Sequence, residues 1–412
     1  MANTFATSSI VIKLATMHLW NHLVAAKCVN RQIAKEFTGN YRTGGTVTIK
    51  KPIESRVNDG AEITTVDDVY QRTITMSATV RKNTNFQLTS QQLTYEMLTG
   101  EVSEEIIKPK MAALANEIDR YILSTAYKKC PNQVGTPGST PSSTKVLRQA
   151  RERLTYHGVP EEDCYAILDP AAVTEISENM KTLLHQGIVQ AAVEGTPQKG
   201  KLAVTLAGFE CYESANVPRH TTGSQAGVSG ATKNGASSEG DTTLALTGLG
   251  SSNTIKEGDI LTLGSVYAVN PQTGAAYPFL RQWVCRADAT ASSGAIAALQ
   301  VIPGTSPYNI RATGPYQNVS ALPANNAAVT VAGSASTIYP VSLAFHKNAI
   351  ALATVPLHMP STAGFKAQQD FEGISIRVVA DFDIKTDVEI YRFDVLFGVE
   401  VLEPFAICRI IG

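Results

Sequence analysis

The sequence has almost no net charge and few cysteines. Among 412 residues, 35 Lys and Arg stand against 36 Asp and Glu, giving a formal net charge of −1. A dedicated nucleic-acid-binding protein carries a basic excess, so this balance argues against that class. The six cysteines are scattered and form no CxxC pair. They predict small buried thiols in a reducing compartment and exclude a disulfide framework.

Long apolar runs are absent as well. No stretch of about 18 uninterrupted apolar residues occurs, so we expect no membrane-spanning helix. The N-terminal stretch MANTFATSSIVIKLATMHLW lacks the basic region and the apolar core of a secretory signal peptide. With an ordinary hydrophobic fraction of 43%, the chain is expected to fold in the cytosol where it is made.

Motifs for a cofactor, a metal or catalysis are also missing. The stretch GLGSSN, residues 248–253, lacks the third glycine and the following helix of a dinucleotide-binding loop. His18 and His22 have the spacing of a zinc pair, but no third ligand is evident nearby. The carboxylates around Asp383 lack the glycine and the final Glu of a calcium loop, and indicate a solvated turn. The sequence therefore predicts no enzyme activity, no cofactor and no metal site.

Two alternating segments near the N-terminus predict strands on either side of a long polar loop. They cover residues 46–50 and 71–80, and the loop between them has about twenty residues. Hairpin connections more often have ~2–5 residues, so a loop of this size is expected to be functional or a contact arm. Lys50 and Lys51 at its start are expected to be exposed charges of an edge strand. The apolar residues of this loop lack an obvious intrachain core: Ile53, Val57, Ile63 and Val66.

The longest predicted helix lies in the first half of the chain. A helix is predicted over residues 103–128, with one apolar stripe formed by Met111, Leu114, Ile118 and Ile122. At ~1.5 Å per residue this helix is close to 40 Å long, enough to brace a domain. An earlier helix is predicted over residues 15–37, and a further amphipathic one over 145–157. Other predicted segments are strands at 163–168, 199–213, 374–381 and 388–401, and a helix followed by a strand within 341–357.

The composition changes after Val217-Pro218. Residues 221–240 are almost all Gly, Ser, Thr, Ala, Asn and Lys, which predicts a surface linker or loop. From residue 241 to about 338, short alternating segments and frequent turn residues predict a β-barrel or sandwich. Within it, IKEGDILTLGSVYAVNPQTG, residues 255–274, predicts two strands joined through Gly264-Ser265. An α/β body is therefore expected to host an inserted β domain.

The order of these parts resembles a known family. The segments that carry the likeness are ALANEIDRYIL, YAILDPAAV, GFECYESANVP, IKEGDILTLGSVYAVNPQTG, FHKNAIALATVPL and RVVADFDIKTDVEIYRFDVLFGVEVLEP. Together they resemble the major capsid proteins of tailed bacteriophages, which have the Johnson (HK97-like) fold. More narrowly, the chain resembles the coat proteins of the short-tailed Salmonella phage P22 group, which carry an inserted β-barrel domain.

This resemblance implies an α+β capsid fold with a long spine helix, an extended β loop and an inserted all-β domain. The implied domains are an N-terminal arm (1–45), the extended loop (46–80), a peripheral domain with the spine helix (81–159), an axial domain (160–216 and 340–373), the inserted β domain (217–339) and the C-terminal strands (374–412). Ile53, Val57, Ile63 and Val66 are then expected at subunit interfaces. Met111, Leu114, Ile118 and Ile122 form the expected core of the spine helix.

The implied function is a major capsid protein that self-assembles into the icosahedral shell around a double-stranded DNA genome. Its expected partners are copies of itself in hexamers and pentamers, a scaffolding protein and a portal protein. Its expected location is the virion capsid, assembled in the bacterial cytoplasm. The alternatives are a cellular nanocompartment shell of the same fold, a secreted β-rich adhesin and a hydrolase. A shell protein would form megadalton particles, whereas an enzyme or adhesin would be small.

Overall fold

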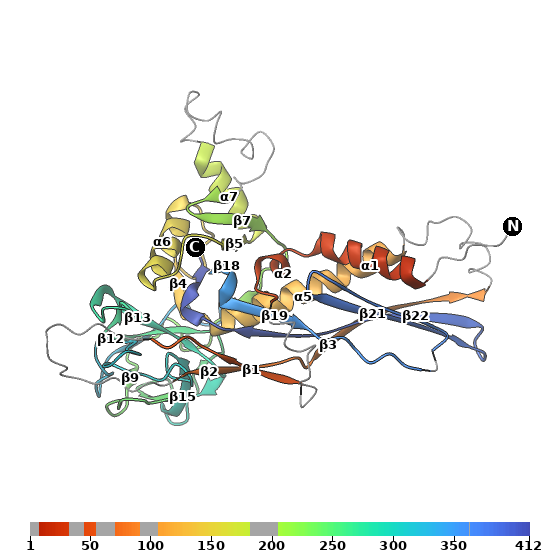
Figure 1. Cartoon of the computed structure of the whole chain (residues 1–412). Helices are drawn as coiled ribbons and strands as arrows, with labels where there is room; N and C mark the ends of the chain where they lie inside the picture. The colour runs from red at the N-terminus through yellow and green to blue at the C-terminus, as the bar shows by residue number, and fades with distance from the viewer. Residues whose placement is uncertain (1–7, 33–44, 55–70, 91–105, 182–204, 362) are drawn as a thin grey trace, which may run out of the picture. The chain divides into compact units, whose positions relative to one another are not determined.

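The computed structural model describes residues 8–32, 45–54, 71–90, 106–181, 205–361 and 363–412 (Figure 1). By its internal contacts the chain divides into two units. The first comprises Met1–Ile49, Thr75–Ile122 and Ile350–Glu400, and the second comprises Lys50–Ile74, Leu123–Ala349 and Val401–Gly412. Both units take segments from distant parts of the sequence. The strands β1 (Thr46–Lys50) and β2 (Thr73–Ser77) form a separate two-stranded sheet.

A five-stranded sheet is the centre of the first unit. Its strands are β3 (Val80–Thr89), β19 (Ile350–Thr354), β20 (Phe365–Phe371), β21 (Ile374–Asp383) and β22 (Val388–Val401). β22 pairs antiparallel with both β3 and β21, and β21 pairs antiparallel with β20. Helix α1 (Ser8–His22) contacts β20 and β21, where the Trp20 and Phe371 rings meet edge to face at 5.7 Å. The predicted C-terminal strands are therefore present with nearly the expected bounds.

The predicted spine helix is α5 (Lys108–Lys129). Pro109 lies in its first turn, where the missing N–H leaves no helical hydrogen bond unmade. The chain belongs to the first unit up to Ile122, and within it Met111, Leu114, Ile118 and Ile122 are all buried.

The prediction of one helix over residues 15–37 is wrong, because the helix ends at His22. A short second helix, α2, covers Ala25–Cys28. The carboxylate of Asp119 accepts hydrogen bonds from the N–H groups of Val24 and Ala26, at 2.7 and 3.0 Å. These bonds satisfy the first turn of α2, whose own cap residue Val24 has no side-chain acceptor. Residues 33–37 of the predicted helix lie outside the described residues.

One sheet of the second unit has six strands in the order β4-β23-β18-β5-β7-β6. These are β4 (Asn132–Val134), β23 (Ile407–Ile410), β18 (Ser342–His346), β5 (Cys164–Leu168), β7 (Phe209–Glu213) and β6 (Thr205–Leu206). Helix α6 (Thr144–Tyr156) buries Leu147, Ala150 and Leu154, which share one hydrophobic core with Phe209 and other sheet residues. Helix α7 (Pro170–Lys181) adds Val173 and Ile176 to the same core.

The helix predicted at the start of 341–357 is wrong. The segment forms strands β18 and β19, separated by a 3-10 turn at Lys347–Ala349. β18 lies between β23 and β5, and four of its five residues are buried. A strand covered on both faces needs no polar alternation, so its apolar run cannot be distinguished from a buried helix by periodicity.

The inserted region carries the second six-stranded sheet, in the order β16-β12-β13-β15-β10-β9. Its strands are β9 (Thr232–Lys233), β10 (Thr243–Thr247), β12 (Ile260–Val269), β13 (Ala276–Cys285), β15 (Ile296–Ile302) and β16 (Val329–Val331). Trp283 is fully buried in a core that includes Leu261, Leu263 and Val301. β8 (Arg219–Thr221) and β17 (Ile338–Pro340), at the two ends of this region, pair antiparallel. A short pair of β11 (Thr254–Ile255) and β14 (Ala289–Thr290) completes the region.

The interpretation of residues 221–240 as a surface linker is wrong for part of the segment, although residues 227–230 and 234–236 are exposed. Gln225, Ala226, Ala231 and Lys233 are all buried, and both alanines belong to the core around Trp283. The small side chains of this segment allow its backbone to pack closely against the sheet. The Gln225 amide oxygen accepts a hydrogen bond from Asn253 Nδ2 at 2.8 Å, which compensates its burial. A polar, glycine-rich composition here reflects close packing.

The two strands predicted within 255–274 are one strand with a bulge. β12 runs through Gly264-Ser265, its register with β13 shifts between Thr262 and Tyr267, and Ser265 has a φ of 63°. A residue in the left-handed region inside a strand is typical of a β-bulge, which bends the strand without ending it. The turn lies instead at Asn270–Gly274, where the Gly274 N–H donates to the Asn270 carbonyl at 2.8 Å.

Candidate functional site

Two buried cations fix the chain where the long loop begins and ends. The Lys51 N–H donates to the Arg72 carbonyl at 2.9 Å, so the two stems pair at this level. The Lys51 ammonium binds the carboxylate of Glu403 and donates to the Tyr308 hydroxyl at 3.0 Å. Lys51 is only 9% exposed, so the prediction that it is an exposed edge charge is wrong. Glu403 and Tyr308 supply the partners that a buried ammonium requires, and both lie far from it in sequence.

Arg72 is held in one orientation at the other stem. It is 7% exposed, and its guanidinium lies 4.5 Å from the Tyr316 ring centroid and 5.4 Å from that of Tyr308. One end of the guanidinium binds the carboxylate of Glu54. Burial raises the pKa of Glu54, although Arg72 and Lys51 act in the opposite direction. Both stems of the loop are therefore anchored by a buried cation. We call these two cations and their partners the loop base: Lys51, Glu54, Arg72, Tyr308 and Glu403.

The predicted interface residues lie on this loop, and the structure describes one of them. Ile53 lies between Lys51 and Glu54 of the loop base and is 50% exposed. Val57, Ile63 and Val66 lie outside the described residues.

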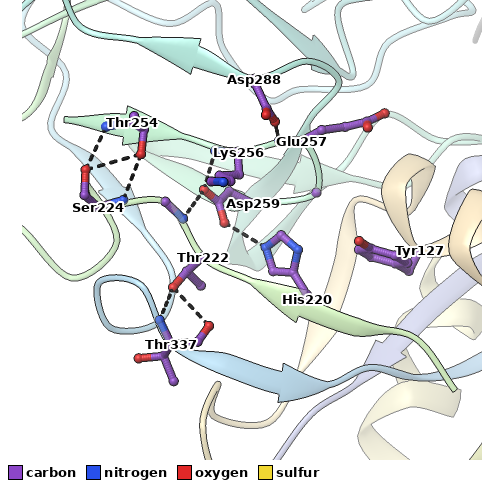
Figure 2. A network of polar contacts seen from close by, with 12 residues as sticks. Tyr127, His220, Thr222, Ser224, Thr254, Lys256, Glu257, Asp259, Asp288 and Thr337 are labelled. Carbon is purple, nitrogen blue, oxygen red and sulfur yellow. Dashed lines mark hydrogen bonds and ion pairs between the residues drawn. The ribbon is translucent and has the colours of Figure 1, made fainter. Parts of the chain in front are cut away.

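Asp259 is the centre of a buried polar network in the inserted region (Figure 2). One carboxylate oxygen is 2.8 Å from His220 Nε2. The other accepts hydrogen bonds from the backbone N–H groups of Gly223 and Lys256, at 3.0 and 2.7 Å. Since Asp259 is 1% exposed, these three contacts supply the polar environment that its burial requires. They join β8 and the chain after it to the start of β12.

The same network continues through hydroxyl groups. The Ser224 and Thr254 side chains lie 3.3 Å apart, and each also accepts a hydrogen bond from the other residue's backbone N–H (Figure 2). The Thr222 hydroxyl donates to the Ser334 carbonyl and accepts from the Thr337 N–H at 2.9 Å. These contacts tie the beginning of the inserted region to its end. We call this set of contacts a structural junction, because it holds the two ends of the inserted region together.

Arg409 extends this junction to the C-terminal strand. It is fully buried on β23, and its guanidinium donates to the carbonyls of Gly258, at 2.6 Å, and Tyr127. The His220 ring lies edge-on to Tyr127 and Tyr339, with both centroid distances 5.7 Å. Burial raises the pKa of Tyr339 to about 12, so this phenol remains protonated at neutral pH. Within the second unit, one arginine therefore connects α5, β23 and the inserted region.

Buried carboxylates also organise the first unit. Asp394 on β22 is fully buried and accepts hydrogen bonds from Arg377, from Arg81 at 3.1 Å and from Arg392 at 2.9 Å. Burial alone would raise the pKa of Asp394, but the hydrogen bonds from the three arginines outweigh it and lower the pKa. These contacts connect β3, β21 and β22.

The described residues hold no group of three His, Cys, Asp or Glu that could bind a metal. His18 and His22 lie on α1, and Asp383 lies in the turn between β21 and β22. Five of the six cysteines are buried and all six are free, as the scattered spacing predicted. No described helix is long and apolar enough to cross a membrane.

Sequence reasoning did not find Asp119, Asp259, Asp394 or Arg409. Each is a charged residue next to or within an apolar run, as in NEIDRYIL, EGDILTL, YRFDVLF and AICRII. An isolated charge among buried positions is a recognisable signal, because such a charge must be paired or hydrogen-bonded. The sequence gives no indication of which distant residue supplies the partner.

In a comparison with known proteins, one family model matches almost the whole chain. The family described as "P22 coat protein - gene protein 5" matches residues 1–411. A search of curated protein sequences finds no match. Similar solved structures include Mycobacterium phage Che8, with 12% identity, a TM-score of 0.46 and coverage of 94% of this chain and 90% of that one. The capsid of Ralstonia phage GP4 has 8% identity, a TM-score of 0.44 and coverage of 90% and 84%. An encapsulin complex from Synechococcus elongatus has 11% identity, a TM-score of 0.38 and coverage of 89% and 81%.

Proposed function

The chain belongs to the P22 coat protein family, and on this premise we propose how its parts build a shell. It is a major capsid protein of a tailed bacteriophage with the HK97-like fold, a structural protein and not an enzyme. Its copies self-assemble into the capsid of the virion. The family match over residues 1–411 is the observation that carries this conclusion.

The finer proposal concerns partners. Copies of the chain occupy both hexamers and pentamers of an icosahedral shell, with the help of a scaffolding protein and around a portal protein. The shell is assembled in the cytoplasm of the bacterial host. It encloses double-stranded DNA without reading its sequence, which agrees with a formal net charge of −1. Closure of such a lattice makes many modest contacts effectively irreversible.

We further propose that residues 46–80 are the extended loop that overlaps a neighbouring subunit. Support comes from the loop base, where Lys51 and Arg72 are buried and bound while Ile53 is half exposed. Fixed stems are what a contact arm between subunits requires. Apolar residues beyond the stems, Val57, Ile63 and Val66, are proposed to contact the neighbouring copy together with Ile53.

We assign the remaining parts of the chain to the domains of the capsid fold. Residues 81–159 form the peripheral domain with the spine helix, 160–216 and 340–373 form the axial domain, and 374–412 supply the C-terminal strands. Residues 217–339 form the inserted domain, which the pairing of β8 with β17 supports because it brings the two ends of this region together. Residues 1–45 form an N-terminal arm. The buried stripe of Met111, Leu114, Ile118 and Ile122 supports the role of α5 as a brace.

Particle formation tests the function directly. The full chain, expressed with a scaffolding protein from the same phage, is expected to sediment as megadalton particles that electron microscopy shows as closed shells. Purified virions should contain this chain as their main protein and DNA that resists nuclease, which distinguishes a phage capsid from a cellular nanocompartment. A chain that sediments only as a small species under these conditions would contradict the assignment.

Replacement of residues 56–69 by a Gly-Ser linker of equal length tests the loop. This change spares Lys51, Glu54 and Arg72, so the loop base and the free energy of unfolding are expected to be retained. Closed shells should not form, because the contacts with the neighbouring subunit are lost. Normal shells from this variant would show that the loop does not drive assembly, while leaving the coat-protein function intact.

A further inference from the structure

A small polar cavity lies beside the loop base. It has a volume of about 90 Å³ and is lined by Arg72, Ser306, Pro307, Asn309, Arg311 and Tyr316. Five of these six side chains carry hydrogen-bond donors. No carboxylate occurs among the described residues that line it. The chemistry of the wall is therefore that of a donor cluster with two guanidinium groups.

The Arg72 guanidinium can donate one more hydrogen bond. Its guanidinium is oriented by the rings of Tyr308 and Tyr316 and by the Glu54 carboxylate. Its Nε has no hydrogen-bond partner among the described residues. A guanidinium whose plane is fixed by aromatic rings loses little freedom when it binds an oxyanion.

The carboxylates around this cavity are engaged elsewhere. Glu54 binds Arg72 outside the cavity wall, and Glu403 binds Lys51. Glu239 accepts hydrogen bonds from the Ala312 N–H and the Thr313 hydroxyl, at 3.0 and 3.1 Å. The described residues give the Arg311 guanidinium no ion-pair partner. Arg311 is exposed, so a negative group from outside the described part of the chain can reach it.

We infer that this cavity binds one small oxyanion group, a carboxylate or a phosphate, between Arg311 and Arg72. A volume of about 90 Å³ holds several waters or one such group, since a single water needs at least ~10–15 Å³ by this measure. Ser306, Asn309 and Tyr316 are the neutral groups that line the site. The test below compares two sources of the oxyanion: an acidic side chain of a second copy in the shell, and free phosphate. In both cases it strengthens the anchoring of the loop base.

Binding of inorganic phosphate to the unassembled full-length chain tests the site. Thermal unfolding is measured with increasing sodium phosphate and with sodium chloride of matched ionic strength. We expect phosphate to raise the unfolding midpoint above that in chloride, because a ligand that binds only the folded state stabilises it. Arg311→Gln should weaken phosphate binding by about tenfold or more, since it removes a charge-assisted contact. Arg311 is exposed, so the variant is expected to fold.

Arg219→Gln is the matched control. Arg219 is also an exposed arginine of the second unit, and it lies outside this cavity. The variant loses the same charge and should keep the response to phosphate. An equal loss of response in both variants would reduce the effect to general charge screening and overturn the proposal. A wild-type chain that responds identically to phosphate and chloride would also overturn it.

Assembled shells distinguish the two sources of the oxyanion. Phosphorus NMR line broadening reports phosphate bound to wild-type shells and to unassembled chain. If an acidic side chain of a second copy fills the cavity, phosphate binding disappears on assembly and Arg311→Gln shells dissociate more readily than Arg219→Gln shells. If free phosphate is the ligand, wild-type shells bind it as the unassembled chain does. Both outcomes require the cavity, and the coat-protein function stands whichever result is obtained.

Discussion

The inserted β region takes its buried residues from one contiguous stretch of the chain, whereas the first unit takes them from several separate segments. The core around Trp283 uses only residues between Ala226 and Val331, one contiguous stretch. The first unit buries Leu19 of α1, Leu114 of α5 and Phe397 of β22, which come from three separate segments. A contiguous core needs no distant partner to close it, whereas a core of three segments forms only when all of them are present. The inserted region is therefore the part expected to fold alone.

The largest expected effect concerns excision of each region. Expressed alone, residues 217–339 should unfold cooperatively and give a β-type circular dichroism spectrum, because their core remains complete. Its midpoint should be lower than in the full chain, since Ile260, Val284 and Ile302 pack with Phe405, which the fragment lacks. The measurement is urea unfolding followed by circular dichroism.

The matched control is residues 350–400, a strand-rich segment of the first unit. This fragment lacks α1, α5 and β3, so we expect it to remain unfolded or to aggregate. A disordered 217–339 fragment would break the comparison and show that the inserted region depends on its host. A cooperatively folded 350–400 fragment would show that the first unit does not need its separate segments in order to fold.

The next prediction concerns the spine helix. Leu114→Ala is expected to lower the free energy of unfolding by ~2–5 kcal/mol, because Leu114 is 3% exposed and its removal leaves a cavity. Shell assembly should become temperature-sensitive, since α5 packs against β22, where the Tyr121 and Phe397 rings meet edge to face at 5.5 Å. Unfolding is measured with urea, and assembly is measured by sedimentation at low and high temperature.

Lys108→Ala is the control on the same helix. Lys108 is exposed, so its loss should leave both stability and assembly close to those of the wild type. If Leu114→Ala assembles as well at high temperature as Lys108→Ala, the helix does not brace the shell-forming surfaces.

A pH dependence follows from Asp119. Burial raises the pKa of this carboxyl from 3.8 to about 6, against the effect of hydrogen bonds from the backbone at Val24, Ala26 and Ala25. Between these two values the folded chain binds more protons at this site than the unfolded chain. The contribution of Asp119 to stability is therefore largest below about pH 4 and is lost as the pH rises through about 6, by up to ~3 kcal/mol.

Asp119→Asn should remove this dependence. The free energy of unfolding of the variant, measured with urea at several values from pH 4 to 7, should change less with pH than that of the wild type. Asp394, whose pKa is lowered, contributes in the opposite direction, so the difference between the two curves isolates Asp119. Parallel curves would show that Asp119 titrates normally in the folded chain.

The elements that sequence reasoning predicted well are long and strongly periodic. α5, α6, β21 and β22 all occur, because their apolar spacing repeats over several turns or alternations. The fold class and the family also followed from the sequence, through the order of the parts. Prediction failed where a tertiary contact decides the local structure. The break between α1 and α2 depends on Asp119, far away in sequence. The burial of Ala226 and Ala231 depends on a sheet that their own segment does not form alone.

The polar sites were less predictable than the fold. Lys51 is separated from Glu403 by 352 positions and from Tyr308 by 257, and each residue alone has the appearance of a surface group. Only folding brings these groups together, and only their mutual compensation allows Lys51 to be buried. The hydrogen bonds of Asp383, by contrast, come from Lys385 and Thr386 close by in sequence, and they agree with its interpretation as part of a turn.

The smallest expected effect comes from a comparison of a partly exposed carboxylate, Asp383, with the buried carboxylate of Asp394 in the first unit. Asp383 is partly exposed in the turn after β21 and accepts hydrogen bonds from the Lys385 N–H and the Thr386 hydroxyl, at 2.9 and 2.8 Å. These two bonds lower its pKa, and both are local. Asp383→Asn keeps one carbonyl oxygen that can accept the Lys385 N–H, so stability should change little and closed shells should still form.

Asp394→Asn, by contrast, leaves three arginines without their shared carboxylate and should yield little soluble protein. Electron microscopy and the soluble yield of both variants check this. Loss of shells in a stable Asp383→Asn variant would mean that this turn contacts another subunit, and the first unit would then present its strand ends as an assembly surface.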